Sequence, residues 1–150
     1  LDWAQNLDFL MVPYRDMLFP WKAHRGFTLK YRAVRDDILA RLGPVFTVAR
    51  SLVITGYSQG GALATLACED IGWHFPSVSI RTVTFGSPRV VGWGAPSRRW
   101  LSLTRYEMRG DPVPMVPPVL FGCKHVGKRI RMGPAAVFRP LAHGEYGGNL

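Results

Sequence analysis

The segment Ser51–Ile71, SLVITGYSQGGALATLACEDI, places a serine at a sharp turn between a short apolar strand and a helix rich in small residues. Residues 52–54 are apolar on both faces of a strand, which is typical of a central strand in a covered parallel sheet. Residues 56–60, GYSQG, then match G-x-S-x-G, the turn that lifts a strained serine hydroxyl above such a sheet. The alternative is a glycine-rich turn whose serine only caps the next helix. Because the required strand and helix flank the pattern, we favour Ser58 as a nucleophile.

Helical and strand patterns alternate along the rest of the chain, which predicts an α/β fold with a mostly parallel sheet and flanking helices. We expect an α/β-hydrolase-type catalytic domain spanning residues 1–150, with no second domain. The expected elements are a helix over Phe27–Leu42 ended by Gly43-Pro44, strands over Val78–Phe85 and Leu101–Met108, and a closing hairpin over His125–Met132 and Ala136–Arg139.

The formal charge of +9 is unevenly distributed along the chain. Residues 89–139 hold 10 basic side chains against Glu107 and Asp111. This excess suits either a solvated basic face or an anionic partner surface. The chain shows no RNA-binding signature, zinc spacing or phosphate-cradling loop, so we expect no nucleic-acid partner, metal or cofactor. Its two cysteines, Cys68 and Cys123, leave the redox compartment open.

A serine nucleophile needs a base and a carboxylate, which follow it in the chain order Ser, acid, His in this fold. Asp70 lies about three helical turns, roughly 18 Å, beyond Ser58 and cannot reach it. Glu107 falls within a predicted strand. Asp111 follows the carboxyl end of that strand, and Pro112 restricts the backbone after it. Asp111 is therefore the predicted acid.

Two histidines follow Asp111. His125 has Lys124 and Lys128 as neighbours, and nearby positive charge disfavours the imidazolium that the mechanism requires. His143 lies in a loop before Gly144 and is the predicted base. The backbone N–H of Gln59, directly after the nucleophile, should supply one oxyanion donor.

Apolar side chains in the amino-terminal segment need a partner, which suggests a lid or an acyl-chain rim near the mouth of the site. A satellite core is the alternative for the loop around Trp21. The rim residues that we expect are Trp3, Leu7, Phe9, Phe19 and Trp21.

Four segments resemble, in order, the signatures of the class 3 lipases, the family of fungal triacylglycerol lipases and related esterases. They are His24–Phe27 (H-x-G-F), Thr55–Ala64 around the nucleophile, Thr84–Val90 and Asp111–Pro114. The resemblance implies Ser58 as nucleophile, Asp111 as acid and His143 as base, and a lid region at Leu1–Phe9. It also implies an acyl-ester or lipid substrate with contact at the lipid interface. Secretion is compatible with the family, but the chain shows no signal-peptide pattern and the sequence assigns no compartment.

Two departures from the family pattern matter. Gln59 replaces the usual leucine, and GYSQG also occurs in cutinases, so a cutinase-like esterase is an alternative. The F-R-G-[ST] segment that supplies the second oxyanion donor is absent, so we expect an amino-terminally truncated domain whose second donor is missing upstream. A non-catalytic remnant of the fold that binds an anionic surface is the remaining alternative.

Overall fold

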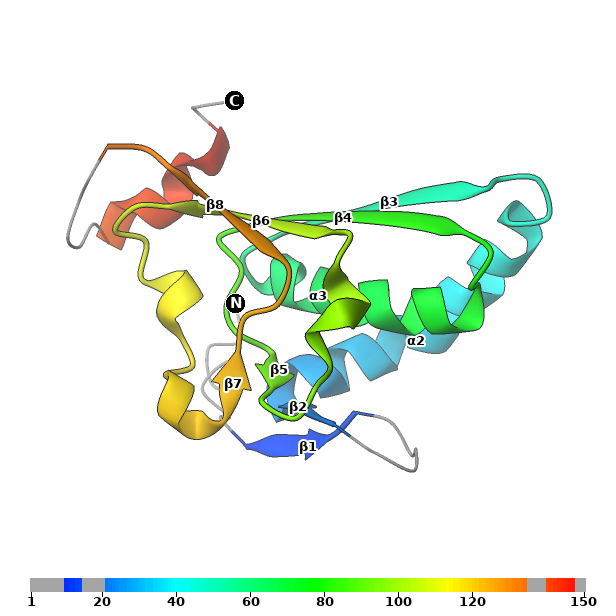
Figure 1. The fold of residues 1–150 in the computed structure, drawn as a ribbon, viewed down its shortest axis with the longest axis horizontal. Coiled ribbons are helices and arrows are strands. Elements are labelled where there is room, and N and C mark those ends of the chain that lie inside the picture. The colour runs from blue at the N-terminus through cyan, green and yellow to red at the C-terminus, as the bar shows by residue number, and fades with distance from the viewer. Residues whose placement is uncertain (1–9, 15–20, 135–139, 148–150) are drawn as a thin grey trace.

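The structure, a computed structural model, describes residues 10–14, 21–134 and 140–147. The larger of its two sheets has parallel strands in the order β3-β4-β6-β8 (Figure 1). These strands are β3 (Ser51–Tyr57), β4 (Ser79–Phe85), β6 (Leu103–Met108) and β8 (Lys128–Met132). Because neighbouring strands are parallel, their carboxyl ends meet at one edge, where catalytic groups gather in α/β sheets. The predicted mostly parallel sheet is confirmed.

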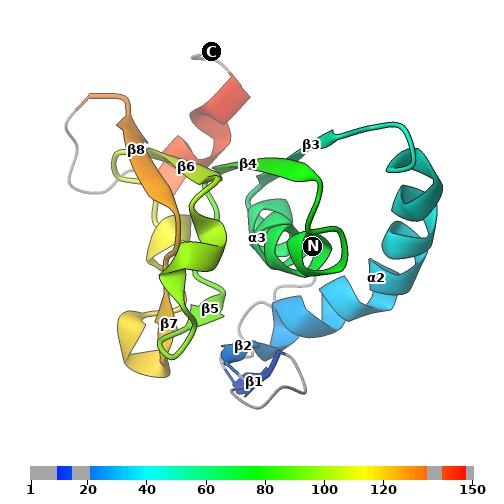
Figure 2. The same cartoon turned by 45° about the vertical axis from the view of Figure 1, so that its right-hand side comes forward.

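Two helices, α2 (Arg25–Val45) and α3 (Gln59–His74), lie on one side of this sheet (Figures 1 and 2). Helix α3 packs its small and apolar side chains beneath β3 and β4; Ala62 and Leu66 are fully buried there. Helix α2 runs through Pro44 and ends at Val45, slightly beyond the predicted stop. Pro44 lies in the last turn, where its missing N–H removes only one intrahelical hydrogen bond.

A polar network joins the two helices. The Asp70 carboxylate on α3 accepts hydrogen bonds from the Tyr31 hydroxyl at 3.0 Å and from Arg35 Nε at 2.7 Å, both on α2. His24 begins α2 as its N-cap, and its Nδ1 accepts from the Phe27 N–H at 3.4 Å. Asp70 and His24 therefore have structural roles.

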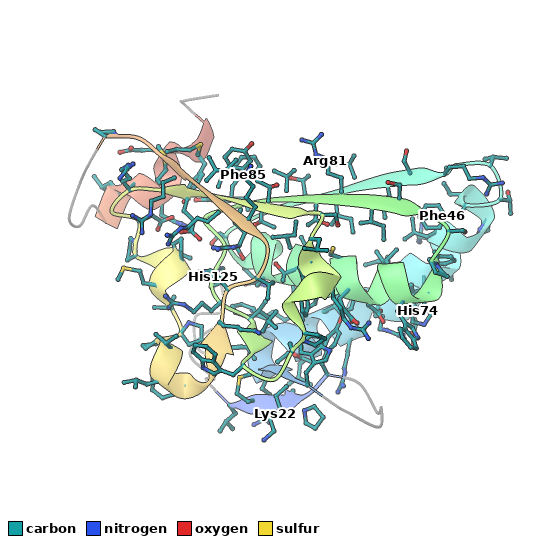
Figure 3. All side chains as sticks on the ribbon, viewed as in Figure 1. Lys22, Phe46, His74, Arg81, Phe85 and His125 are labelled. Atoms are coloured by element: carbon teal, nitrogen blue, oxygen red, sulfur yellow. The ribbon has the colours of Figure 1, made fainter. Side chains whose placement is uncertain are left out.

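Among the strands that the structure describes, β3 lies at the edge of the larger sheet. Its outer face is uncovered at Val53, which corrects the prediction that both faces are covered. Val53 is 67% exposed and Tyr57 is 47% exposed on its outer face. Figure 3 shows Arg81 and Phe85 of β4 on that same outer face, opposite the helices. Around residues 52–54 the described residues cover only the inner face, so the apolar pattern there is satisfied on one side alone.

A second sheet is antiparallel, in the order β1-β2-β5-β7. Its short strands are β1 (Met11–Pro13), β2 (Lys22–His24), β5 (Val91–Gly92) and β7 (Cys123–Lys124). Strand β8 overlaps the first arm of the predicted closing hairpin, His125–Met132, and pairs in parallel with β6, so the hairpin pairing itself stays a prediction. Residues 135–139, the other arm of that hairpin, lie outside the described residues.

Trp21 corrects part of the predicted rim. It is 5% exposed, and its ring lies 4.3 Å from that of Tyr14 and 5.3 Å from that of Trp100. A large aromatic side chain gains more from these packed ring contacts than from a solvent-facing position. Trp21 therefore belongs to the core, which was the alternative to a place in the rim. The other predicted rim residues, Trp3, Leu7, Phe9 and Phe19, lie outside the described residues.

None of the helices in the described ranges is long and apolar enough to cross a lipid bilayer.

Candidate active site

Ser58 occupies the turn between β3 and α3 in the strained conformation that its sequence pattern predicts. Its φ of 54° is the only positive value among the described non-glycine residues. A side chain on Gly56 would collide with the backbone carbonyl of Gly60, so glycine is required where strand and helix nearly touch. The Ser58 side chain makes no capping hydrogen bond to α3, which argues against the alternative of a simple helix cap. The turn instead presents the hydroxyl at the carboxyl edge of the sheet.

Three side chains from separate elements form one hydrogen-bonded chain at this edge. Ser58 Oγ lies 2.7 Å from His143 Nε2, and His143 Nδ1 lies 3.0 Å from Asp111 Oδ2. Asp111 follows β6, and His143 lies in the 3₁₀ helix η4 (Pro140–Gly147). The structure thus brings together the three residues that the sequence nominates, within direct hydrogen-bonding distance.

The Asp111 carboxylate is fully buried and is held by three donors. Besides His143, the Tyr146 hydroxyl donates to its Oδ2 at 2.7 Å, and the Val113 N–H donates to its Oδ1 at 2.9 Å. The carboxylate is therefore fixed in an orientation that places the proton of His143 on Nδ1 and leaves Nε2 free to accept.

Tyr146 is a site residue that the sequence analysis did not nominate. Its hydroxyl accepts the Met108 N–H at 2.8 Å while donating to Asp111, which ties the carboxylate to the end of β6. Burial raises the pKa of Tyr146 well above its ordinary value of 10.0, so the hydroxyl keeps its proton. The available signal was its spacing of three residues from His143, since residues i and i+3 share a face of a 3₁₀ helix.

Two further contacts position the His143 ring. Tyr57 stacks on it with ring centroids 5.0 Å apart, and the Tyr57 hydroxyl donates to the His143 carbonyl. Gly86, with φ of +55°, also lies against the ring, since an added Cβ would stand 3.0 Å from the imidazole. The His143 ring therefore leaves no room for a side chain at position 86.

A pocket of about 490 Å³ opens beside the Ser58 hydroxyl. We call it the acyl pocket; its apolar lining comes from Phe27, Leu63, Pro88, Val113 and Val116. Gln59 also lines it, and the Gln59 Oε1 accepts a hydrogen bond from Lys30 Nζ of α2 at 3.1 Å. This bond holds the residue whose backbone N–H is the predicted oxyanion donor. The pocket suits an apolar chain whose polar end reaches Ser58 and His143.

A larger cavity, of about 980 Å³, lies between α2 and α3 but is remote from this chemistry. Its Asp70 carboxylate already accepts hydrogen bonds from the Tyr31 and Arg35 side chains. Size alone therefore does not identify the site. Within the described ranges, no group of three His, Cys, Asp or Glu side chains is arranged to hold a metal ion.

His125 lies apart from the nucleophile. Its Nε2 donates to the Pro114 carbonyl at 2.7 Å, and its side chain is 17% exposed. Burial, together with the positive charge of Arg105, lowers the pKa of His125 from 6.5 to about 3. A ring that stays neutral and donates to a carbonyl is poorly suited to act as the base, in agreement with the choice of His143.

The depressed pKa of His125 predicts a loss of stability in mild acid. In the unfolded chain the ring binds a proton near pH 6.5, whereas the folded ring remains neutral down to about pH 3. The stabilising contribution is therefore present above pH 6.5 and is lost as the pH falls. We expect the free energy of unfolding to fall by about 2 kcal/mol between pH 7 and pH 5 because of this residue.

Urea unfolding of the wild type and of His125→Gln at both pH values measures this effect. The glutamine amide can still donate to Pro114, so the variant should lose about 2 kcal/mol less over the same interval. Burial raises the pKa of nearby Glu107 and acts in the opposite direction, but it is present in both proteins. Equal losses in the two proteins would show that His125 does not carry the dependence.

The fold and the geometry at the sheet edge are those of the α/β-hydrolase class, with a serine, a histidine and a buried aspartate in the expected order. The sequence model of the family Lipase (class 3) matches residues 1–121. The chain therefore belongs to the class 3 lipase family.

Curated relatives and solved structures agree with this assignment. Phospholipase A1-II 6 of Oryza sativa subsp. japonica is 30% identical over 79% of this chain and 38% of its own length. The secreted mono- and diacylglycerol lipase A of Penicillium cyclopium is 35% identical over 69% of this chain and 35% of its own. The chain thus spans less than two-fifths of the length of these relatives.

Among solved structures, lipase II from Rhizopus niveus superimposes with a TM-score of 0.75 at 28% identity, over 83% of this chain and 49% of that one. A triacylglycerol lipase whose catalytic centre is a serine protease triad gives a TM-score of 0.78 at 26% identity, over 89% of this chain and 53% of that one.

Proposed function

We propose that the chain is the catalytic part of a serine ester hydrolase that cleaves acyl esters, including lipid esters, through an acyl-enzyme. The observation that carries this proposal is the hydrogen-bonded chain from Ser58 through His143 to Asp111, set beside an apolar pocket. The lipase relatives support lipase-type ester hydrolysis over the cutinase-like and non-catalytic alternatives.

The reaction follows from the positions of these groups. Ser58 Oγ attacks the ester carbonyl carbon while His143 Nε2 accepts the hydroxyl proton, and Asp111 stabilises the imidazolium that forms. The Gln59 N–H donates to the developing oxyanion, and collapse transfers the proton from His143 to the leaving alcohol. Water then attacks the carbonyl carbon of the acyl-enzyme while His143 accepts a proton from it, and His143 returns that proton to Ser58 as the acid leaves. That an F-R-G-[ST] segment supplies the second oxyanion donor remains a prediction.

Covalent labelling with a fluorophosphonate tests the proposal. We expect the probe to modify Ser58, as located by mass spectrometry, and Ser58→Ala to remove the modification. Ser51→Ala is the matched control, because Ser51 is exposed at the far end of the same strand. A folded wild-type protein that shows no labelling would instead support the non-catalytic alternative.

A further inference from the structure

A cavity of about 300 Å³, which we call the arginine cavity, lies on the other side of the 113–116 segment from the acyl pocket. Val113 and Val116 line the acyl pocket, whereas Pro114 and Met115 line the arginine cavity. Figure 3 shows His125, which also lines the cavity, beneath β6 and β8. One short segment therefore separates an apolar pocket from a cationic one. The arginines that line the cavity are Arg89, Arg109, Arg129 and Arg131.

The register of β6 and β8 fixes the side of the sheet on which two of these arginines lie. In the parallel pairing of β6 and β8, Arg129 lies opposite Arg105 and Arg131 lies opposite Glu107. Because side chains two residues apart share a face of a strand, these four groups point to the same side of the sheet. Ile130, between the two β8 arginines, faces the other side. The alternation in the sequence KRIRM thus directs two guanidinium groups toward the cavity.

Arg89 enters the cavity from the loop after β4 in a fixed orientation. Its Nη1 donates to the Pro117 carbonyl at 2.9 Å and also to the Met115 carbonyl. Carbonyl oxygens hold the guanidinium without neutralising its charge. The group is therefore organised in advance for an anion, with little further entropy to lose on binding.

Two carboxylates, Glu107 and Asp111, also line the cavity, and both are already engaged. Glu107 pairs with the buried Arg105, and Asp111 is held by His143, Tyr146 and Val113. Within the part of the chain that the structure describes, none of the four lining arginines forms an ion pair with a carboxylate. The excess basic charge that the sequence shows over residues 89–139 is thus gathered, in part, around one cavity.

We propose that the arginine cavity binds a phosphate-type oxyanion, either free phosphate or the phosphate of a lipid headgroup. Guanidinium groups bind phosphate oxygens through paired N–H donors, and four of them around a small cavity match a compact anion rather than an apolar chain. The adjoining acyl pocket would place the headgroup of an anionic lipid interface next to Ser58. Anion binding at this site does not depend on any step of the proposed hydrolysis.

Binding is measured on the full 150-residue chain carrying Ser58→Ala, so that no ester is cleaved and the result is independent of the proposed activity. The probes are inorganic phosphate, followed by calorimetry, and phosphatidylcholine vesicles containing phosphatidylglycerol, followed by co-sedimentation. Vesicles made negative with oleate control for charge without added phosphate. The cavity variant is Arg129→Gln with Arg131→Gln. Its charge-matched control is Arg81→Gln with Lys128→Gln, which removes exposed basic groups outside the cavity lining.

We expect saturable phosphate binding that weakens about tenfold or more in the cavity variant and is retained in the control. Loss of phosphatidylglycerol vesicle binding as well would identify the lipid headgroup as a source, whereas retained vesicle binding would identify free phosphate. Both outcomes support the site. Arg109→Gln, which alters an exposed lining residue, should weaken phosphate binding even if the double variant fails to fold. Absence of phosphate binding in the wild type, or equal weakening in the cavity and control variants, would overturn the proposal.

Discussion

Replacing Ser58 or His143 with alanine is expected to lower kcat on a short p-nitrophenyl ester by on the order of 10⁶, the effect that loss of the nucleophile or base has in subtilisin. The expectation rests on the 2.7 Å contact between Ser58 Oγ and His143 Nε2, since each group is ineffective without the other. Combining the two substitutions should therefore cost little more than either one alone. Steady-state kinetics of the single and double variants measure this non-additivity.

The matched control is His125→Gln, which should retain most of the activity because the His125 ring bonds the Pro114 carbonyl. If His125→Gln were more damaging than His143→Ala, the assignment of the base would be wrong. The kcat of the wild type sets the reference for these ratios. A missing second oxyanion donor would lower it by roughly 10²–10³ in every variant alike, so ratios between variants remain comparable.

The nucleophile turn was predictable because its determinants are local. Gly56 and Gly60 satisfy a steric demand within five residues, and the strained φ of Ser58 follows from that turn. The meeting of Asp111 and His143 with Ser58 was also predictable, because parallel strands place the loops that follow them at one edge of the sheet. Order along the chain was then enough to choose between the candidates.

Non-local packing was less accessible from the sequence. Trp21 is apolar and precedes a polar helix, which suits a lid as well as a core, and only its contacts with Tyr14 and Trp100 decide between them. Strand β8 has the alternation of a hairpin arm, yet it pairs with β6. Periodicity gives the faces of a strand but not its partner.

The role of Tyr146 was hidden for the same reason. Its partners Met108 and Asp111 are distant in sequence, and a tyrosine three residues after a histidine has no meaning until the 3₁₀ helix carries both to the sheet edge. The basic excess of residues 89–139 was visible as a charge count. Its concentration around one cavity required the register of β6 and β8.

Asp111→Asn is expected to leave the fold intact and to lower kcat on the same ester by on the order of 10⁴, the effect that replacing the triad aspartate with asparagine has in a serine protease. The carboxylate accepts from His143 Nδ1 at 3.0 Å, whereas an asparagine NH₂ turned toward the ring would donate to it. The proton would then reside on Nε2, which could no longer accept the proton of Ser58. KM should change little, because the residues that line the acyl pocket are untouched.

Tyr146→Phe tests how much the hydrogen bond from Tyr146 to Asp111 contributes, apart from the negative charge of Asp111. The variant keeps the carboxylate but removes the donor at 2.7 Å and leaves the Met108 N–H without its hydroxyl acceptor. A buried unsatisfied donor costs about 1–3 kcal/mol, so we expect a clear loss of stability in urea. The loss in kcat should be only about tenfold, because His143 still has a carboxylate to accept its Nδ1 proton. A loss as large as that of Asp111→Asn would mean that the orientation of the carboxylate, rather than its ability to accept, sets the tautomer of His143.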